Sequence, residues 1–157
     1  MAGERMTSTE IWIRLIHIGL LCGDAMLELA SQLSKQTTID GVTLREAGLS
    51  AAQAGRFIAL SEGELERSLV WLEQPGNYLL TADHPLYPPL LRTFPDYPGA
   101  LFVTGNLEAL NAVQLAVVGS RAPSWYGERW GRILSEQLSQ IGRASCREEG
   151  RSRWSPY

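Results

Sequence analysis

Hydrophobic residues in the first half of the chain recur three or four positions apart, between short polar breaks. Ile11, Leu15 and Ile18 follow Thr7 and Glu10, which have the spacing of a capping box, the usual start of an amphipathic helix. The same reasoning predicts a second helix, begun by Asp24, with these residues on one face: Met26, Leu29, Ala30 and Leu33. Further helices are predicted over 43–47, after Ser50 and over 62–73. The last of them is expected to bury Leu65, Leu69, Val70 and Leu72. We expect about five short helices, a small bundle that is only marginally stable alone.

The pattern changes after Gly76, because proline and glycine end the last helix and short apolar runs follow. Runs at 78–80 and 101–103 predict strands, and the prolines between them predict an extended connection. Residues 114–118 are almost continuously apolar and β-branched, as in a strand that is buried on both faces of a parallel sheet. A helix is then expected from near Tyr126 or Gly127, with these residues facing inward: Trp130, Ile133, Leu134 and Leu138.

A strand, a glycine turn, a polar loop and a helix form the opening of a doubly wound α/β domain. The chain is therefore expected to be an α+β fragment, with a helical domain over residues 7–76 and the start of an α/β domain over 77–140. Residues 1–6 are an uncertain N-terminal extension, since translation could start at Met1 or at Met6.

Residues 141–157 have a different character, with many Arg and Ser residues, few aliphatic residues and no helical or strand period. The stretch from Ile141 to Glu148 resembles the translation of a sequencing-library adaptor, and residues 151–157 resemble its continuation. We interpret 141–157 as a non-native, adaptor-derived and disordered tail, and exclude its arginines from functional arguments. A genuine basic tail that helps to bind DNA is the alternative.

Composition limits the possible partners. The formal net charge is −3, and residues 1–140 hold ten Arg and Lys residues against fifteen Asp and Glu residues, so nucleic-acid binding would need a local patch. No apolar run approaches the ~20 residues that cross a bilayer, so we expect no membrane association.

Cysteine and histidine residues are too few and too scattered for several kinds of chemistry. Cys22 and Cys146 give neither a disulfide framework nor metal-ligand spacing, which fits a cytoplasmic protein. His17 and His84 lie in separate segments, so no metal site and no catalytic residue is predicted.

The candidate chemistry lies where residues 114–118 end. In open α/β sheets, ligands bind at the carboxyl ends of strands, and Gly119, Ser120 and Arg121 occupy that position. The glycine allows close backbone approach, the serine offers a hydroxyl, and the arginine offers planar donors for phosphate oxygens beside a helix N-terminus. The sequence is neither GxGxxG nor a Walker A loop, so no nucleotide cofactor is predicted. The alternative is an ordinary turn with a solvated Arg121.

Two aromatic residues follow this loop. Trp125 and Tyr126 could stack on the bases of a single strand, since aromatic residues beside arginine are a common platform for it. Alternatively, Tyr126 and Trp130 pack the helix against the sheet.

Residues 115–121, with Tyr126 and Gly127, resemble the DprA/Smf family of DNA-processing proteins. The resemblance extends to other residues: Gly23-Asp24, residues 71–75, Asp83, residues 87–91, residues 97–103 and Gly105. It implies a SAM-like or helix-hairpin-helix-like helical domain followed by a Rossmann-like domain, and covers roughly residues 6–140.

The resemblance also implies a function. Family members bind single-stranded DNA, form homodimers and help to load a RecA-type recombinase during natural transformation. Arg121 matches the arginine of the DNA-binding pocket, with Gly119 and Ser120 shaping the loop and Tyr126 and Gly127 completing the motif. No cofactor is implied.

Two other functions remain open. Related Rossmann-like domains include nucleotide-processing hydrolases, although residues 1–140 lack the glycine-rich, glutamate-containing motif of that class. A stand-alone helical module, binding a protein partner through residues 7–75, is the other.

Overall fold

The computed structural model describes residues 6–19, 21–120, 122–139 and 143–148, which form two compact units. The first unit is Met1–Asn111 and the second is Ala112–Tyr157. The compact units divide at Asn111, because the strands after Gly76 pack against the helices before it, as described below. The domain boundary that the sequence suggests at Gly76 stays a prediction.

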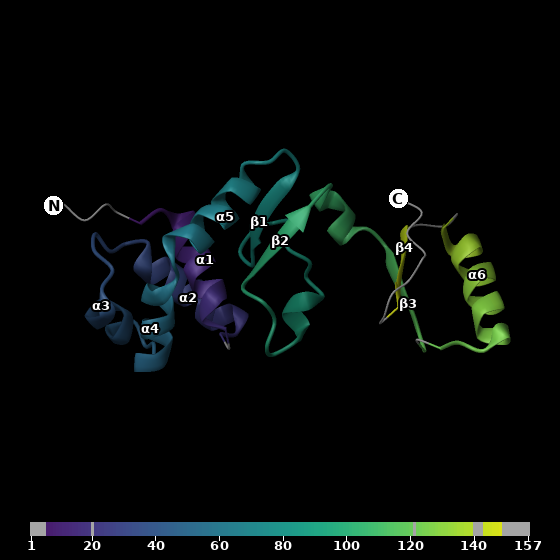
Figure 1. Cartoon of the computed structure of the whole chain (residues 1–157), viewed down its shortest axis with the longest axis horizontal. Coiled ribbons are helices and arrows are strands. Elements are labelled where there is room, and N and C mark those ends of the chain that lie inside the picture. The colour runs from purple at the N-terminus through teal and green to yellow at the C-terminus, as the bar shows by residue number, and fades with distance from the viewer. Residues whose placement is uncertain (1–5, 20, 121, 140–142, 149–157) are drawn as a thin grey trace. The chain divides into compact units, whose positions relative to one another are not determined.

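Five helices open the first unit (Figure 1): α1 (Ser8–Ile18), α2 (Gly23–Leu33), α3 (Gly41–Glu46), α4 (Ala51–Ala59) and α5 (Glu62–Leu72). Ser50 with Gln53, and Ser61 with Glu64, form reciprocal capping boxes at the starts of α4 and α5. At α1 the Thr7 hydroxyl accepts the backbone N–H of Glu10 at 3.2 Å, while the Glu10 carboxylate binds Arg14 instead of completing a box.

Two helix starts differ from the sequence prediction. Helix α2 begins at Gly23, and its N-cap Cys22 makes no side-chain capping bond, so Asp24 is not the N-cap. The Asp24 carboxylate accepts a hydrogen bond from Tyr97, 73 residues further along the chain, which the local sequence could not reveal. Helix α3 begins at Gly41, two residues before the predicted start, because Asp40 accepts the N–H groups of Val42 and Thr43.

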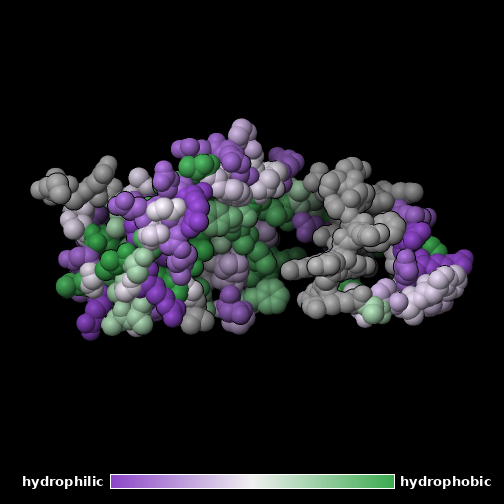
Figure 2. All heavy atoms as spheres, viewed as in Figure 1, coloured by the Kyte–Doolittle hydropathy of each residue, from purple (hydrophilic) through white to green (hydrophobic). Residues whose placement is uncertain are grey.

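The first hydrophobic core lies among these helices, and α1 contacts α2, α4 and α5. Its most deeply buried members have no more than 1% of their surface exposed: Ile11, Leu15, Ile18, Leu33, Leu44 and Phe57. Figure 2 shows hydrophilic and hydrophobic residues intermixed on the outer face of the bundle. The apolar side chains of α5 are less buried than predicted, since Val70 is half exposed and Leu65, Leu69 and Leu72 are only partly buried.

Helices α1 and α4 cap each other with arginines. The buried Arg14 of α1 donates to the carbonyls of Phe57 and Leu60, at 2.9 and 3.4 Å, at the end of α4. Arg56 of α4 donates to the carbonyl of Ile18, the last residue of α1, at 3.1 Å. Each guanidinium thus satisfies carbonyls that have no partner within their own helix and lies at the negative end of a helix dipole.

Strands β1 (Asn77–Thr81) and β2 (Ala100–Thr104) form an antiparallel hairpin. Each of its two faces packs in a different hydrophobic core. On one face, Leu79 and Ala100 pack with the helical core. On the other, Leu80 joins a second core with Ala82, Tyr87 and Tyr97 from the proline-rich connection. The connection contains the 3-10 turn η1 (Leu91–Thr93), and η2 (Leu107–Asn111) follows the hairpin.

The second unit is a β–α–β arrangement of β3 (Gln114–Gly119), α6 (Trp125–Ser139) and β4 (Arg143–Glu148) (Figure 1). Strands β3 and β4 are parallel, from the pair Gln114–Arg143 to the pair Gly119–Glu148. A small α/β fragment thus follows the helical region, which is the fold class expected from the sequence.

Strand β4 lies in the stretch for which the sequence predicted disorder. Residues 143–148 instead pair with β3, because a strand edge carries N–H and C=O groups that a neighbouring chain segment can satisfy. The structure thus has a strand over six residues of the segment that the sequence predicts to be a disordered tail. The rest of 141–157 lies outside the described residues, and the non-native origin of this segment stays a prediction.

Burial in the second unit is also lower than predicted. Val118 is 79% exposed, although β3 was expected to be buried on both faces. Trp130, Ile133 and Leu134 of α6 are 45%, 38% and 47% exposed rather than facing a core. Within the described part of this unit the sheet has two strands, which are too few to cover one helix face and both sides of a strand.

Candidate functional site

Strand β3 ends at Gly119, the first residue of the candidate site. Gly119 is exposed, and a Cβ atom built there would have no neighbour within 4 Å. No positive φ requires a glycine at this position. Its effect is therefore to leave the backbone open at the carboxyl end of β3, where a ligand can approach closely.

The loop after β3 is held by its own serines. The Ser120 hydroxyl accepts the N–H of Ala122 at 3.3 Å, a local serine-to-backbone hydrogen bond. Ser124 caps α6, since its hydroxyl accepts the N–H of Gly127 at 3.2 Å. The sequence pattern predicted the start of α6 one or two residues too late, and Ser124 was missed, although a serine directly before an aromatic-rich helix is a usual cap signal.

Four of the five predicted site residues lie within the described part of the chain. Gly119 and Ser120 lie at the strand end, and Tyr126 and Gly127 lie in the first turn of α6, so one short loop joins the four. Arg121, the predicted phosphate ligand, lies outside the described residues. A Cβ on Gly127 would meet Ser124 and Pro123 at ordinary contact distances of 3.5 and 3.8 Å, so packing alone does not require this glycine.

Aromatic side chains surround the start of α6. Tyr126 is 64% exposed and meets Trp130 edge to face, with 6.0 Å between ring centroids. Trp125 is 71% exposed, and the guanidinium of Arg129 lies over its ring at 5.4 Å from the centroid. Such an aromatic–arginine arrangement can take up a planar base by stacking.

Two other features are absent from the described residues. Among the described residues, no group of three or more His, Cys, Asp and Glu residues could hold a metal ion. No helix within the described ranges is long and apolar enough to cross a membrane.

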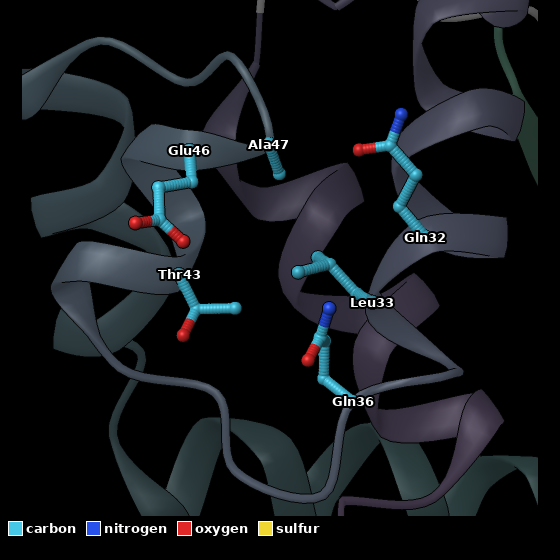
Figure 3. A pocket seen from close by; sticks show the side chains of 6 residues that line it. All are labelled: Gln32, Leu33, Gln36, Thr43, Glu46 and Ala47. Atoms are coloured by element: carbon cyan, nitrogen blue, oxygen red, sulfur yellow. The ribbon is translucent and has the colours of Figure 1, made fainter.

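A small hollow lies between the end of α2 and α3, lined by Gln32, Leu33, Gln36, Thr43, Glu46 and Ala47 (Figure 3). Its volume of about 130 Å³ is well below the several hundred Å³ of typical ligand pockets. The six labelled side chains come only from α2, α3 and the residues next to them, so none of the predicted site residues contributes.

A second group of motif residues forms a structural joint. The Tyr97 ring lies so close to Gly23 that a Cβ there would be 1.9 Å from a ring carbon, and the Tyr97 hydroxyl donates to Asp24 at 2.7 Å. Two residues later, Gly99 lies close to Met26, since a Cβ built on this glycine would be 2.7 Å from the Met26 side chain.

Tyr97, in this joint, and its neighbour Tyr87 both have raised pKa values. Burial and the bond to the Asp24 carboxylate raise the pKa of Tyr97 above its usual value. Burial likewise raises the pKa of Tyr87, whose ring meets Tyr97 edge to face. The motif residues around 23–24 and 97–99 therefore fix α2 to the hairpin and need no ligand to explain them.

Comparison with known proteins identifies both parts of the chain. Residues 6–70 match the family model described as the SMF/DprA SAM domain. Residues 78–144 match the model described as DNA recombination-mediator protein A, which includes the whole β3–α6 loop. The chain belongs to the DprA/Smf family.

Two individual proteins named Smf are similar to this chain. The chain is 53% identical over 137 residues to protein Smf of Escherichia coli, an alignment that covers 87% of this chain and 37% of that protein. It is 34% identical over 74 residues to protein Smf of Synechocystis sp., covering 45% of this chain and 19% of that protein. The chain thus spans little more than a third of the length of the E. coli relative.

A solved structure supports the fold. The X-ray structure of DNA processing protein A (DprA) from Streptococcus pneumoniae matches with a TM-score of 0.58 at 19% sequence identity. The match covers 92% of this chain and 58% of that one.

Proposed function

We propose that this chain contributes to a recombination mediator that binds single-stranded DNA in the cytoplasm, and that it acts by binding rather than as an enzyme. The observation that carries the proposal is the match of residues 78–144 to the DNA recombination-mediator model, because this segment contains the loop from Gly119 to Gly127. The full protein would act in DNA uptake and natural transformation, would pair with a second copy and would load a RecA-type recombinase.

The loop geometry supports binding of a phosphate backbone. Gly119 leaves space at the strand end, and the N-terminus of α6 offers N–H groups and a favourable field for an anion. Arg121 comes between them in the sequence and would supply charge-assisted hydrogen bonds to phosphate oxygens. Since the chain is acidic overall, the attraction would come from this local site.

The test is binding of this chain to a fluorescein-labelled oligothymidylate, measured by anisotropy at several salt concentrations. Arg121→Ala is compared with Arg45→Ala, which removes the same charge from an exposed position of α3. We expect Arg121→Ala to weaken binding and to reduce the slope of log K against log salt by about 0.7, the contribution of one phosphate contact on a single strand.

The control variant Arg45→Ala should bind as the unsubstituted chain does. Equal affinities for Arg121→Ala and Arg45→Ala would remove Arg121 from the site. No feature of the described residues favours a nucleotide-processing hydrolase or a stand-alone helical module over DNA binding.

A further inference from the structure

Helix α6 has two faces that differ in chemistry. A helix turns by about 100° per residue, so side chains three or four positions apart share a face. Its apolar residues fall on one such face: Tyr126, Trp130, Ile133, Leu134 and Leu138. This face needs no ligand to explain it, because an apolar stripe of this spacing is the usual surface by which a helix packs.

Trp125 lies outside the apolar stripe. It shares its face with Arg129 and Arg132, four and seven positions further along the helix. Glu128 lies beside this face and forms an ion pair with Arg132, with 3.5 Å between nitrogen and oxygen. Because Trp125 lies on this charged face, packing of the apolar stripe does not explain it.

The contacts of Trp125 suit a planar, negatively charged partner. Trp125 is 71% exposed, and the guanidinium carbon of Arg129 lies 5.4 Å from the centroid of its ring. An exposed indole beside arginines can stack on an unpaired base, while the arginines attract the phosphates of the same strand. In sequence Trp125 directly follows the Ser124 cap, so it lies at the end of the loop that begins with Gly119.

We propose that Trp125 and Arg129 form a stacking platform for an unpaired base of single-stranded DNA next to the phosphate-binding loop. The inference rests on the proposed function and extends it, because it assigns base contact to the charged face of α6 and phosphate contact to the loop. It separates Trp125 from Tyr126 and Trp130, which belong to the packing face.

The platform makes a prediction that a purely electrostatic site does not. Stacking needs bases, so Trp125→Ala should weaken binding of an oligothymidylate by about 5- to 150-fold. Trp125→Phe keeps an aromatic ring and should retain most of the affinity. With an abasic strand of the same length and charge, Trp125→Ala should bind as the unsubstituted chain does.

The experiment compares the two strands by anisotropy for the unsubstituted chain, Trp125→Ala, Trp125→Phe and Arg121→Ala. Phe94→Ala is the matched control, since it removes a ring that is 59% exposed in the first unit. Because Trp125 is largely exposed, its removal should leave the far-ultraviolet circular dichroism and the thermal transition unchanged.

The outcomes distinguish the platform from the proposed function. If Arg121→Ala loses binding while Trp125→Ala binds oligothymidylate normally, the platform is wrong and the loop stands. An equal loss on both strands for Trp125→Ala would also overturn base stacking. If the unsubstituted chain binds neither strand, the proposed function fails for this chain, and the platform fails with it.

Discussion

The hydroxyl of Tyr97 donates to the carboxylate of Asp24 at 2.7 Å and so joins the chain segment before β2 to the first turn of α2. The ring of the same tyrosine lies directly against Gly23, where any side chain would collide with it. Residues 73 positions apart thus form one joint between the helices and the hairpin. Together with the packing of Leu79 and Ala100 in the helical core, the joint links the hairpin to the helices within one compact unit.

Gly23→Ala tests the close approach in this joint. The added Cβ would lie 1.9 Å from a ring carbon of Tyr97, so the ring or the helix must shift. We expect a loss of about 1–3 kcal/mol in the free energy of unfolding, as for other overpacked sites. Urea unfolding followed by circular dichroism measures it.

The matched control is Gly55→Ala within α4, where an added Cβ has no neighbour within 4 Å. Replacing glycine by alanine in an open helical position should stabilise the chain by about 0.5–1 kcal/mol. Opposite signs for the two substitutions are expected. A stabilising Gly23→Ala would show that Tyr97 does not pack against this glycine.

Tyr97→Phe tests the hydrogen bond through its dependence on pH. The pKa of Tyr97 is raised in the folded chain, so its contribution to stability is complete below the ordinary value of 10.0 and is lost as the pH rises through the folded value. Tyr97→Phe should be less stable at neutral pH, and the difference should shrink above pH 10.0. Both proteins retain Tyr87, so the comparison isolates Tyr97. A difference that stays constant up to alkaline pH would contradict the assignment.

The helices were predictable because their signals are local. Ser50 and Ser61 act within four residues of themselves, and both caps are present as such sequence patterns indicate. Asp24 was misread for the opposite reason: it has the right residue type for a cap, but a tyrosine distant in sequence binds it. The antiparallel pairing of β1 with β2 is equally non-local.

The sequence predicted where the candidate site lies along the chain better than it predicted the contacts of the side chains there. The apolar run at 114–118 followed by glycine placed Gly119 and Ser120 at a strand end, where the structure has them. The sequence grouped Trp125 with Tyr126 as neighbours, although adjacent helical residues point about 100° apart. The contact of Arg129 with Trp125 requires α6 to begin at Trp125, one or two residues before the start that the sequence predicts.

The two capping arginines should differ in their contribution to stability. Arg14 is 8% exposed and donates to two carbonyls, so Arg14→Ala leaves buried acceptors without a partner. We expect it to cost about 2–3 kcal/mol. Arg56 makes one bond at an exposed position, and Arg56→Ala should cost at most about 1 kcal/mol. Equal losses in thermal or urea unfolding would show that burial does not set the strength of these caps.

Asp40 should make the start of α3 sensitive to acid. Hydrogen bonds from the backbone and side chain of Thr43 lower the pKa of Asp40 below its ordinary value of 3.8. A lowered pKa means that the stabilisation is present above pH 3.8 and is lost as the pH falls through the folded value. Asp40→Ala should therefore lower the urea midpoint at neutral pH, and its effect should decrease once the carboxyl is protonated. Asp96→Ala, in the exposed connection before β2, is the control and should change the midpoint little at either pH. An Asp40→Ala effect that is the same at neutral and strongly acidic pH would mean that the carboxylate charge does not contribute to the cap.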